Sequence, residues 1–115
     1  MSDAAILNVN EGDEFYIRFK SSYRMKTLSS REWRFVNYNE IPSALENFNK
    51  NGTAFKQEKK SFFMGQTVTS YYKFKALKTS YNEITLKFQY SNTGHDLEKP
   101  EYYVKNIRVD ILPKQ

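Results

Sequence analysis

The residues best suited to acid–base or metal chemistry lie together between positions 95 and 101. This segment holds the chain's single histidine, His95, next to Asp96, with Glu98 and Glu101 following. Adjacent His and Asp side chains rarely orient one another as a catalytic triad requires, and these carboxylates follow no structural zinc spacing. We therefore interpret His95 as a solvated loop residue and expect no catalytic group and no metal ligand here.

The rest of the sequence offers few groups for catalysis or cofactor binding. The 115 residues include no cysteine, which excludes disulfides, thiol nucleophiles and thiolate metal sites. The sequence contains no glycine-rich loop that could hold a phosphate group. No serine lies in the strand–turn–helix context of an activated nucleophile. The sequence thus predicts a protein that is not an enzyme and binds no cofactor.

Composition indicates a single domain over residues 1–115. Aromatic residues make up 17% of the chain, which supplies a core and is unlike a disordered sequence. No apolar run approaches the ~18 residues needed to span a membrane, and the N-terminus carries no secretory signal. We therefore expect a cytoplasmic monomer that does not enter a membrane. The net charge of +5 serves solubility or favours an acidic partner.

Alternation of apolar and polar residues is the clearest pattern in the chain. Apolar and basic residues alternate in Ser70–Ala76, and a similar alternation returns in Ile84–Tyr90. Period-2 alternation is typical of half-buried antiparallel strands, and the short polar turn between these segments predicts a hairpin. Further strands are predicted at Ile6–Asn10, Glu14–Lys20, Glu32–Asn37, Thr53–Lys59 and Tyr102–Leu112.

The connection between the third and fourth predicted strands has a helical spacing instead. Ile41, Leu45 and Phe48 recur at intervals of four and three residues, and Pro42 suits the start of a helix. The sequence predicts one short helix or helical turn over Ile41–Asn49, with an irregular crossing as the alternative.

Seven short strands separated by turn signals predict an all-β fold, a seven-stranded immunoglobulin-like antiparallel β-sandwich. Successive connections in such a sandwich alternate between its two ends. The connections after the second, fourth and sixth strands therefore share one end, as antibody recognition loops do. Here these connections are Ser21–Arg31, Lys60–Thr67 and Ser91–Glu101. Three irregular segments at one end predict a binding edge.

Several framework features follow one another in a fixed order along nearly the whole chain. They are Gly12-Asp13 before Phe15 and Ile17, a loop leading into Trp33, Phe74-Lys75-Ala76, Leu86–Tyr90 and the closing strand Val104–Ile111. In this order they resemble the chagasin family, the immunoglobulin-like inhibitors of papain-type cysteine proteases. The resemblance implies that the three connections form a wedge that plugs the cleft of a papain-like protease, with Trp33 in the framework.

The three connections differ from those of the chagasin family. Ser22–Ser30 is longer and lacks the family's Pro and Gly, the glycine-rich motif is reduced to Met64-Gly65-Gln66, and Ser91-Asn92-Thr93 replaces Arg-Pro-Trp. A few buried anchors supply most of the affinity at such interfaces. The expected partner-contacting residues are Tyr23, Arg24, Met25, Lys26, Thr27, Leu28, Met64, Gly65, Gln66, Asn92, Thr93 and His95.

The changed connections also suit a module of the same fold that binds another protein, and the strand faces suggest a third possibility. Basic side chains interleaved with tyrosines can track a nucleic-acid backbone and stack on bases, although outward lysines are also ordinary on a soluble sheet. The residues concerned are Tyr16, Arg18, Lys20, Tyr71, Lys73, Lys75 and Lys87. Binding to a polyanion would weaken steeply with salt, whereas plugging a cleft would not. Carbohydrate binding through exposed tyrosines is a further option.

Overall fold

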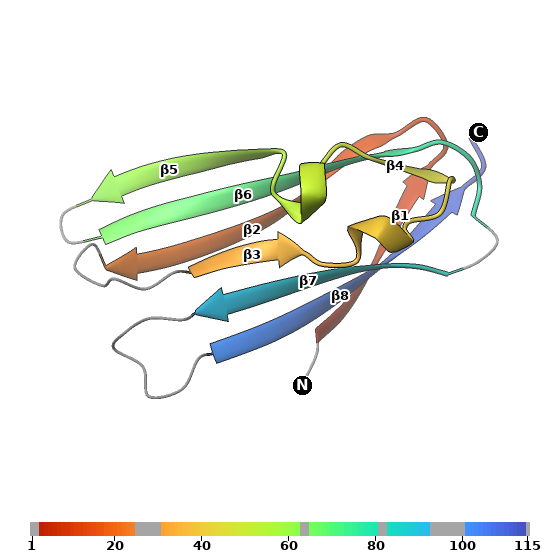
Figure 1. Cartoon of the computed structure of the whole chain (residues 1–115). Coiled ribbons are helices and arrows are strands. Elements are labelled where there is room, and N and C mark those ends of the chain that lie inside the picture. Colours follow the sequence, from red (N-terminus) through yellow and green to blue (C-terminus); the bar gives the residue numbers. More distant parts are fainter. Residues whose placement is uncertain (1–2, 25–30, 63–64, 81–82, 93–100, 115) are drawn as a thin grey trace.

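The computed structural model describes residues 3–24, 31–62, 65–80, 83–92 and 101–114 (Figure 1). Within these residues the chain forms eight strands and two single-turn 3-10 helices, Tyr38–Glu40 and Lys50–Gly52. The strands are β1 Asp3–Asn10, β2 Glu14–Arg24, β3 Arg31–Phe35, β4 Leu45–Asn47, β5 Lys56–Phe62, β6 Gly65–Ala76, β7 Ile84–Asn92 and β8 Glu101–Leu112. The predicted all-β class is confirmed. No helix in the described part of the chain is long and apolar enough to cross a membrane.

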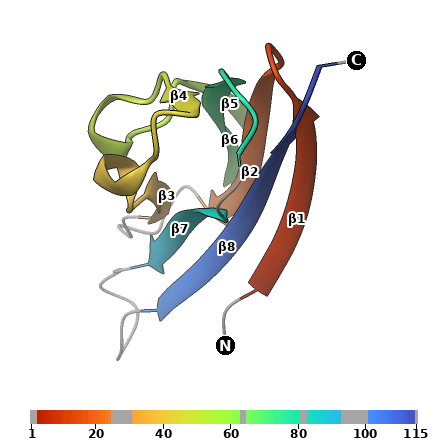
Figure 2. The same cartoon turned by 90° about the vertical axis from the view of Figure 1, so that its right-hand side faces the viewer.

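The strands form two sheets. One has the order β1-β8-β7-β3, and in the other β2 and β4 flank β6, with β5 also paired to β6. All pairs are antiparallel except β1 with β8, which is parallel. β4 and β5 cover different stretches of the same edge of β6, so they are two pieces of one interrupted edge strand. Figure 2 shows the chain between β3 and β5 crossing from one sheet to the other along one side of the molecule.

The core lies between the sheets because each strand turns alternate side chains inward. In β6 the side chains of Tyr72, Phe74 and Ala76 are fully buried, while the residues between them are partly exposed. Burying aromatic and branched apolar side chains supplies the main stabilisation of such a domain. The buried apolar residues are Val9, Ile17, Phe19, Phe35, Ala44, Leu45, Tyr72, Phe74, Ala76, Ile84, Leu86, Phe88, Ile107, Val109 and Ile111.

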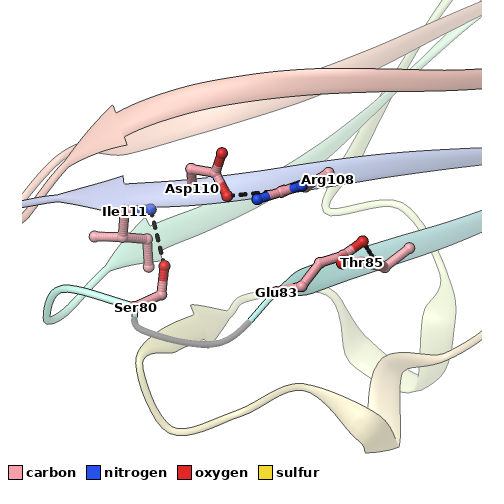
Figure 3. Close-up of polar contacts among 6 residues, drawn as sticks. All are labelled: Ser80, Glu83, Thr85, Arg108, Asp110 and Ile111. Carbon is pink, nitrogen blue, oxygen red and sulfur yellow. Dashed lines mark hydrogen bonds and ion pairs between the residues drawn. The ribbon is translucent and has the colours of Figure 1, made fainter.

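The predicted Ser70–Tyr90 hairpin is wrong, because its two strands belong to different sheets. β6 pairs with β2, β4 and β5, whereas β7 pairs with β3 and β8. Alternation identifies a strand with one buried face but does not identify the strand beside it. The connection after β6 crosses between the sheets, and Ser80 then bonds the end of β8. Its backbone N–H donates to the Ile111 carbonyl over 3.2 Å, and its Oγ accepts from the Ile111 N–H over 3.0 Å (Figure 3).

The helix predicted over Ile41–Asn49 is also wrong, since this segment contains the short strand β4. A nine-residue helix is marginal in water, whereas the part of the β6 edge that β5 does not cover offers backbone partners. Leu45–Asn47 pairs with Ala76–Phe74 on that edge, and the Leu45 side chain points into the core. Of the three residues whose spacing suggested a helix, Ile41 and Leu45 pack toward the core, whereas Phe48 meets the Phe55 ring outside it.

Two buried asparagines extend the sheets where the backbone leaves them. The Asn37 side chain donates to the Thr85 carbonyl and accepts from the Lys87 N–H, each over 2.8 Å, so it continues the β3–β7 pairing beyond Phe35. Asn49 bonds the backbone of Lys73 in the same manner, in the interval between β4 and β5. Both amides satisfy buried backbone groups that would otherwise lack partners.

Candidate functional site

Six strand ends meet at one end of the sandwich. In the β2–β6–β5 sheet, Gly65 at the start of β6 pairs with Arg24 at the end of β2 and with Phe62 at the end of β5. In the other sheet, Asn92 at the end of β7 pairs with Arg31 at the start of β3 and with Glu101 at the start of β8. We call this end, on the left in Figure 1, the tip end. It is the end at which the sequence predicts a shared binding edge.

The predicted contact residues fall into two groups. Tyr23 and Arg24 are the last residues of β2, Gly65 and Gln66 are the first of β6, and Asn92 is the last of β7. These five therefore lie in strands, which corrects their prediction as loop residues. The remaining predicted contacts lie outside the described residues; they are Met25, Lys26, Thr27, Leu28, Met64, Thr93 and His95.

The connections at the tip end are shorter than predicted because the flanking strands continue further. β2 runs to Arg24 instead of Lys20, and β5 runs to Phe62 instead of Lys59. Near the tip end the inward positions of β5 and β6 include polar residues such as Ser61 and Gln66, which pair across the two strands. Polar residues on both faces remove the alternation on which strand prediction depends.

The acidic segment around His95 is a candidate metal site in the sequence and is not expected to bind a metal. His95, Asp96 and Glu98 lie outside the described residues. Within the described residues, no group of three or more His, Asp or Glu side chains is arranged to hold a metal ion.

A row of aromatic rings in contact leads from the core to the tip end. The buried Phe19 ring stacks on Trp33 with centroids 4.3 Å apart, Trp33 packs on Tyr90 at 5.4 Å, and Tyr90 packs on Tyr103 at 5.8 Å. Trp33, Tyr90 and Tyr103 are direct cross-strand partners on β3, β7 and β8. Exposure rises along the row from 8% at Phe19 to 55% at Tyr103. Tyr103 thus presents an exposed aromatic ring beside the tip end, packed against Tyr90, which in turn packs against Trp33.

Sequence reasoning did not single out Tyr103. It lies two residues before Lys105 and four before the buried Ile107, on the inward side of β8 by alternation. The sequence signal that could have identified Tyr103 is an aromatic residue at an inward position close to the start of a strand. Trp33 is partly buried in the row and packs against the core, which fits its expected place in the framework.

A second surface of interest is the outer side of the β2–β6–β5 sheet. Direct cross-strand pairing places Tyr16 opposite Lys73, Arg18 opposite Tyr71, and Tyr71 opposite Lys56 on β5. We call this surface, including the adjoining residue of β4, the basic face. Its members are Glu14, Tyr16, Arg18, Lys20, Glu46, Lys56, Glu58, Lys60, Thr67, Thr69, Tyr71, Lys73 and Lys75.

The structure gathers six of the seven residues predicted for a nucleic-acid surface on the basic face. The exception is Lys87, which lies on β7 in the other sheet. Its grouping with Lys73 and Lys75 depended on the incorrect hairpin. The structure also adds Phe48 and Phe55, from the chain between β4 and β5, which sequence reasoning did not associate with this surface.

The aromatic rings at one end of the basic face form a cluster together with two lysines. Tyr16 meets Tyr71 edge-on at 6.2 Å and Phe55 at 6.4 Å, and Phe55 meets Phe48 at 6.5 Å. The Lys56 Nζ lies 4.8 Å from the Tyr71 ring centre, and the Lys73 Nζ lies 4.7 Å from that of Phe48. Cation–π contacts of this length hold the ammonium groups over the rings. Tyr16 and Phe55 nevertheless stay 48% and 45% exposed.

A surface hollow of about 470 Å³ adjoins this cluster. The residues that line it include three cations of the basic face, Arg18, Lys20 and Lys60, and also Lys59, Glu58, Tyr71 and two threonines. Tyr71 belongs to both the hollow and the aromatic cluster, and its hydroxyl donates to Glu58 over 3.2 Å. The hollow therefore combines positive charge with hydroxyl donors, a chemistry that suits an anion.

Comparisons with known proteins assign no function to these surfaces. No protein-family model matches the chain, and neither does any curated protein. Among solved structures, one match is a family 123 glycoside hydrolase from Clostridium perfringens, described in a study of glycolipid glycan hydrolysis. It aligns with 96% of this chain and 23% of its own length, at 10% identity and a TM-score of 0.44. The chain thus spans about a quarter of that enzyme, and so distant a likeness carries no functional argument.

Proposed function

We propose that this chain is a non-catalytic protein-binding module of immunoglobulin-like topology that contacts its partner through the tip end. The partner we propose is a papain-type cysteine protease, whose cleft the three connections would plug. The resemblance of the framework to the chagasin family motivates this choice of partner. The protein would act as a monomer, and inhibition would need no reactive group of its own.

The sheet topology supports an immunoglobulin-like assignment. β2, β6 and the interrupted β4–β5 edge correspond to strands B, E and D of that fold, and β3, β7 and β8 correspond to C, F and G. One difference is that β1 joins β8, whereas strand A of a constant-type domain joins B, E and D. Counting β4 and β5 as one interrupted strand gives the seven strands of the proposed topology.

The observation that carries the proposal is the meeting of six strand ends beside an exposed aromatic residue. A loop inhibitor needs rigid supports for its connections, and here paired strands continue to the base of each connection. Interface energy concentrates in aromatic anchors held in place before binding. Tyr103 has this character, because Tyr90 and Trp33 support its ring from behind.

A titration of papain and a cathepsin L-type protease tests the proposal. Residual hydrolysis of a fluorogenic peptide is followed at physiological salt as purified protein is added. We expect reversible inhibition that reaches completion at one protein per active site, and the same result when the salt concentration is doubled. Absence of inhibition at micromolar protein rejects the protease as the partner. The tip end would then be tested against another protein, by pull-down with the intact chain and with a Tyr103→Ala variant.

A further inference from the structure

We propose that the basic face is a binding surface for single-stranded nucleic acid. This surface lies on the β2–β6–β5 sheet, away from the row of aromatic rings that leads to Tyr103. The inference is independent of the proposed protein-binding function. It rests on three properties of the basic face: its charge, its hollow and its exposed rings.

The basic face holds most of the excess positive charge of the protein. Its six cations, Arg18, Lys20, Lys56, Lys60, Lys73 and Lys75, face three carboxylates, Glu14, Glu46 and Glu58. Six against three leaves an excess of three, compared with a net charge of +5 for the whole chain. Neutralising phosphates with Lys and Arg, and releasing their counterions, is the main source of affinity for nucleic acids.

Of the three carboxylates, Glu58 lines the hollow, whereas Glu14 and Glu46 do not. Glu14 pairs with Lys73 at 3.7 Å, and Glu58 lies 4.0 Å from Lys56, so these acids offset lysines of the aromatic cluster. Arg18, Lys20 and Lys60 have no ion pair with another described residue. Their charges converge on the hollow, where a phosphate group would meet cations from both β2 and β5.

The exposed rings distinguish a nucleic acid from an acidic polypeptide. Tyr16 and Phe55 present nearly half of their surface to solvent in a cluster beside the hollow. Bases stack on such rings whatever their sequence, whereas a run of Asp and Glu has no flat group to place there. A strand with phosphates at the hollow and bases over Tyr16 and Phe55 would use both features. The bases of a duplex are stacked on one another and not available to these rings, which favours the single strand.

The outer side of the other sheet also carries cations, among them Arg34, Lys87 and Arg108, and Arg108 has acidic partners. There the Arg108 Nε donates to Asp110 over 3.0 Å (Figure 3). The hydrogen bond and charge of Asp110, together with the charge of Glu83, raise the pKa of Arg108. Acidic partners thus accompany Arg108, in contrast to Arg18, Lys20 and Lys60 on the basic face, which have no ion pair with another described residue.

The test is the fluorescence anisotropy of a labelled 15-nucleotide oligothymidylate, titrated with the full chain at salt concentrations from 50 to 300 mM. We expect binding that weakens steeply with salt. The variant R18A/K20A/K60A should lose at least tenfold in affinity at 100 mM salt. Its logarithmic salt slope should fall by about 2, since each lost contact to a single strand contributes ~0.7.

Two further variants make the test specific. K78A/K87A/K114A removes the same charge from exposed positions outside the basic face, and it should bind within threefold of the unchanged protein. Y16A/F55A should bind several-fold more weakly with an unchanged salt slope, because it removes stacking and no charge. Circular dichroism and thermal melting confirm that each variant is folded.

Three results would overturn the proposal. They are absence of binding at micromolar protein and 50 mM salt, equal weakening by the two triple variants, and competition by polyglutamate as strong as that by unlabelled oligothymidylate. Equal weakening would mean that total charge alone attracts the strand. Effective competition by polyglutamate would assign the basic face to an acidic polypeptide.

Discussion

The side-chain amide of Asn49 hydrogen-bonds both backbone groups of Lys73, at a point on the β6 edge that neither β4 nor β5 covers. Its Oδ1 accepts from the Lys73 N–H over 2.9 Å, and its Nδ2 donates to the Lys73 carbonyl over 3.0 Å. A second contact fixes the amide, because its Nδ2 also donates to the Asn47 Oδ1. The Asn49 side chain thus takes the place of the backbone of an edge-strand residue. The chain can therefore leave the sheet edge at this point while the backbone groups of Lys73 stay hydrogen-bonded.

The variant Asn49→Ala should be clearly destabilised, because it leaves the buried N–H of Lys73 without a partner. The expected loss in the free energy of unfolding is about 1–3 kcal/mol, the cost of an unsatisfied buried polar group. Urea denaturation followed by tryptophan fluorescence measures it. The exposed neighbour Lys50 provides the control, since Lys50→Ala should change stability by less than ~0.5 kcal/mol. If Asn49→Ala were as stable as the unchanged protein, water would be replacing the Asn49 amide as the partner of the Lys73 N–H.

Two glycines with positive φ should respond differently to the same substitution. Gly12 has φ +89° and open space where a Cβ would lie, whereas Gly52 has φ +79° and would place that Cβ 2.4 Å from the Phe35 carbonyl oxygen. Gly12→Ala should cost about 1–2 kcal/mol through backbone strain alone. Gly52→Ala should cost more, since the backbone must also move away from Phe35. Thermal melting of the two variants side by side tests this order, and the reverse order would contradict the described packing around Gly52.

The hydroxyl of Tyr72 should contribute to the cohesion of the two sheets. It crosses the core from β6 and donates to the Trp33 carbonyl on β3 over 2.7 Å. Tyr72→Phe keeps the ring and removes this bond, so we expect a loss of about 1 kcal/mol in urea denaturation. Tyr16→Phe, on an exposed ring, is the matched control and should be neutral. If both variants unfold at the same urea concentration, the hydroxyl contributes no net stability.

Substitution of Tyr103 should affect binding, whereas substitution of Trp33 should affect the stability of the fold. Tyr103→Ala removes a ring that is 55% exposed and should leave the melting temperature nearly unchanged. Under the proposed function, it should weaken protease inhibition at least tenfold. Trp33→Ala removes a partly buried ring stacked on Phe19 and should cost about 2–4 kcal/mol, somewhat less than a fully buried Trp. Inhibition unchanged by Tyr103→Ala would exclude this ring as an anchor.

Much of the strand pattern was predictable, because burial on one face leaves a period of two in the sequence. The Phe74 and Leu86 segments show this clearly, and both residues are fully buried. Partner choice was not predictable from the same signal, which is why β6 and β7 were assigned to one hairpin. The short strand β4 was not predicted because three residues are too few to show alternation. In addition, the next bonds to the β6 edge are made by the side chain of Asn49 and leave no backbone pattern in the sequence.

The candidate sites were predictable to different degrees. The residues of the basic face alternate along β2 and β6, so Tyr16, Arg18 and Tyr71 could be assigned to outer faces before their pairing was known. Phe55 could not be included, since it reaches the cluster from an irregular segment that tertiary packing folds over the sheet edge. Tyr103 was missed because its importance comes from stacking on Tyr90 across the strands, a relationship that requires the register.

The parallel pairing of β1 with β8 has a mechanical consequence. Eight residue pairs, from Asp3 with Lys105 to Asn10 with Leu112, join the two strands in the same direction. A pulling force applied at the N-terminal end of β1 and the C-terminal end of β8 would therefore act along the strands and load all the hydrogen bonds between them together. Such a shear arrangement resists extension far better than one in which bonds break one after another. A pull between these two strand ends would thus be opposed by the whole β1–β8 pairing at once.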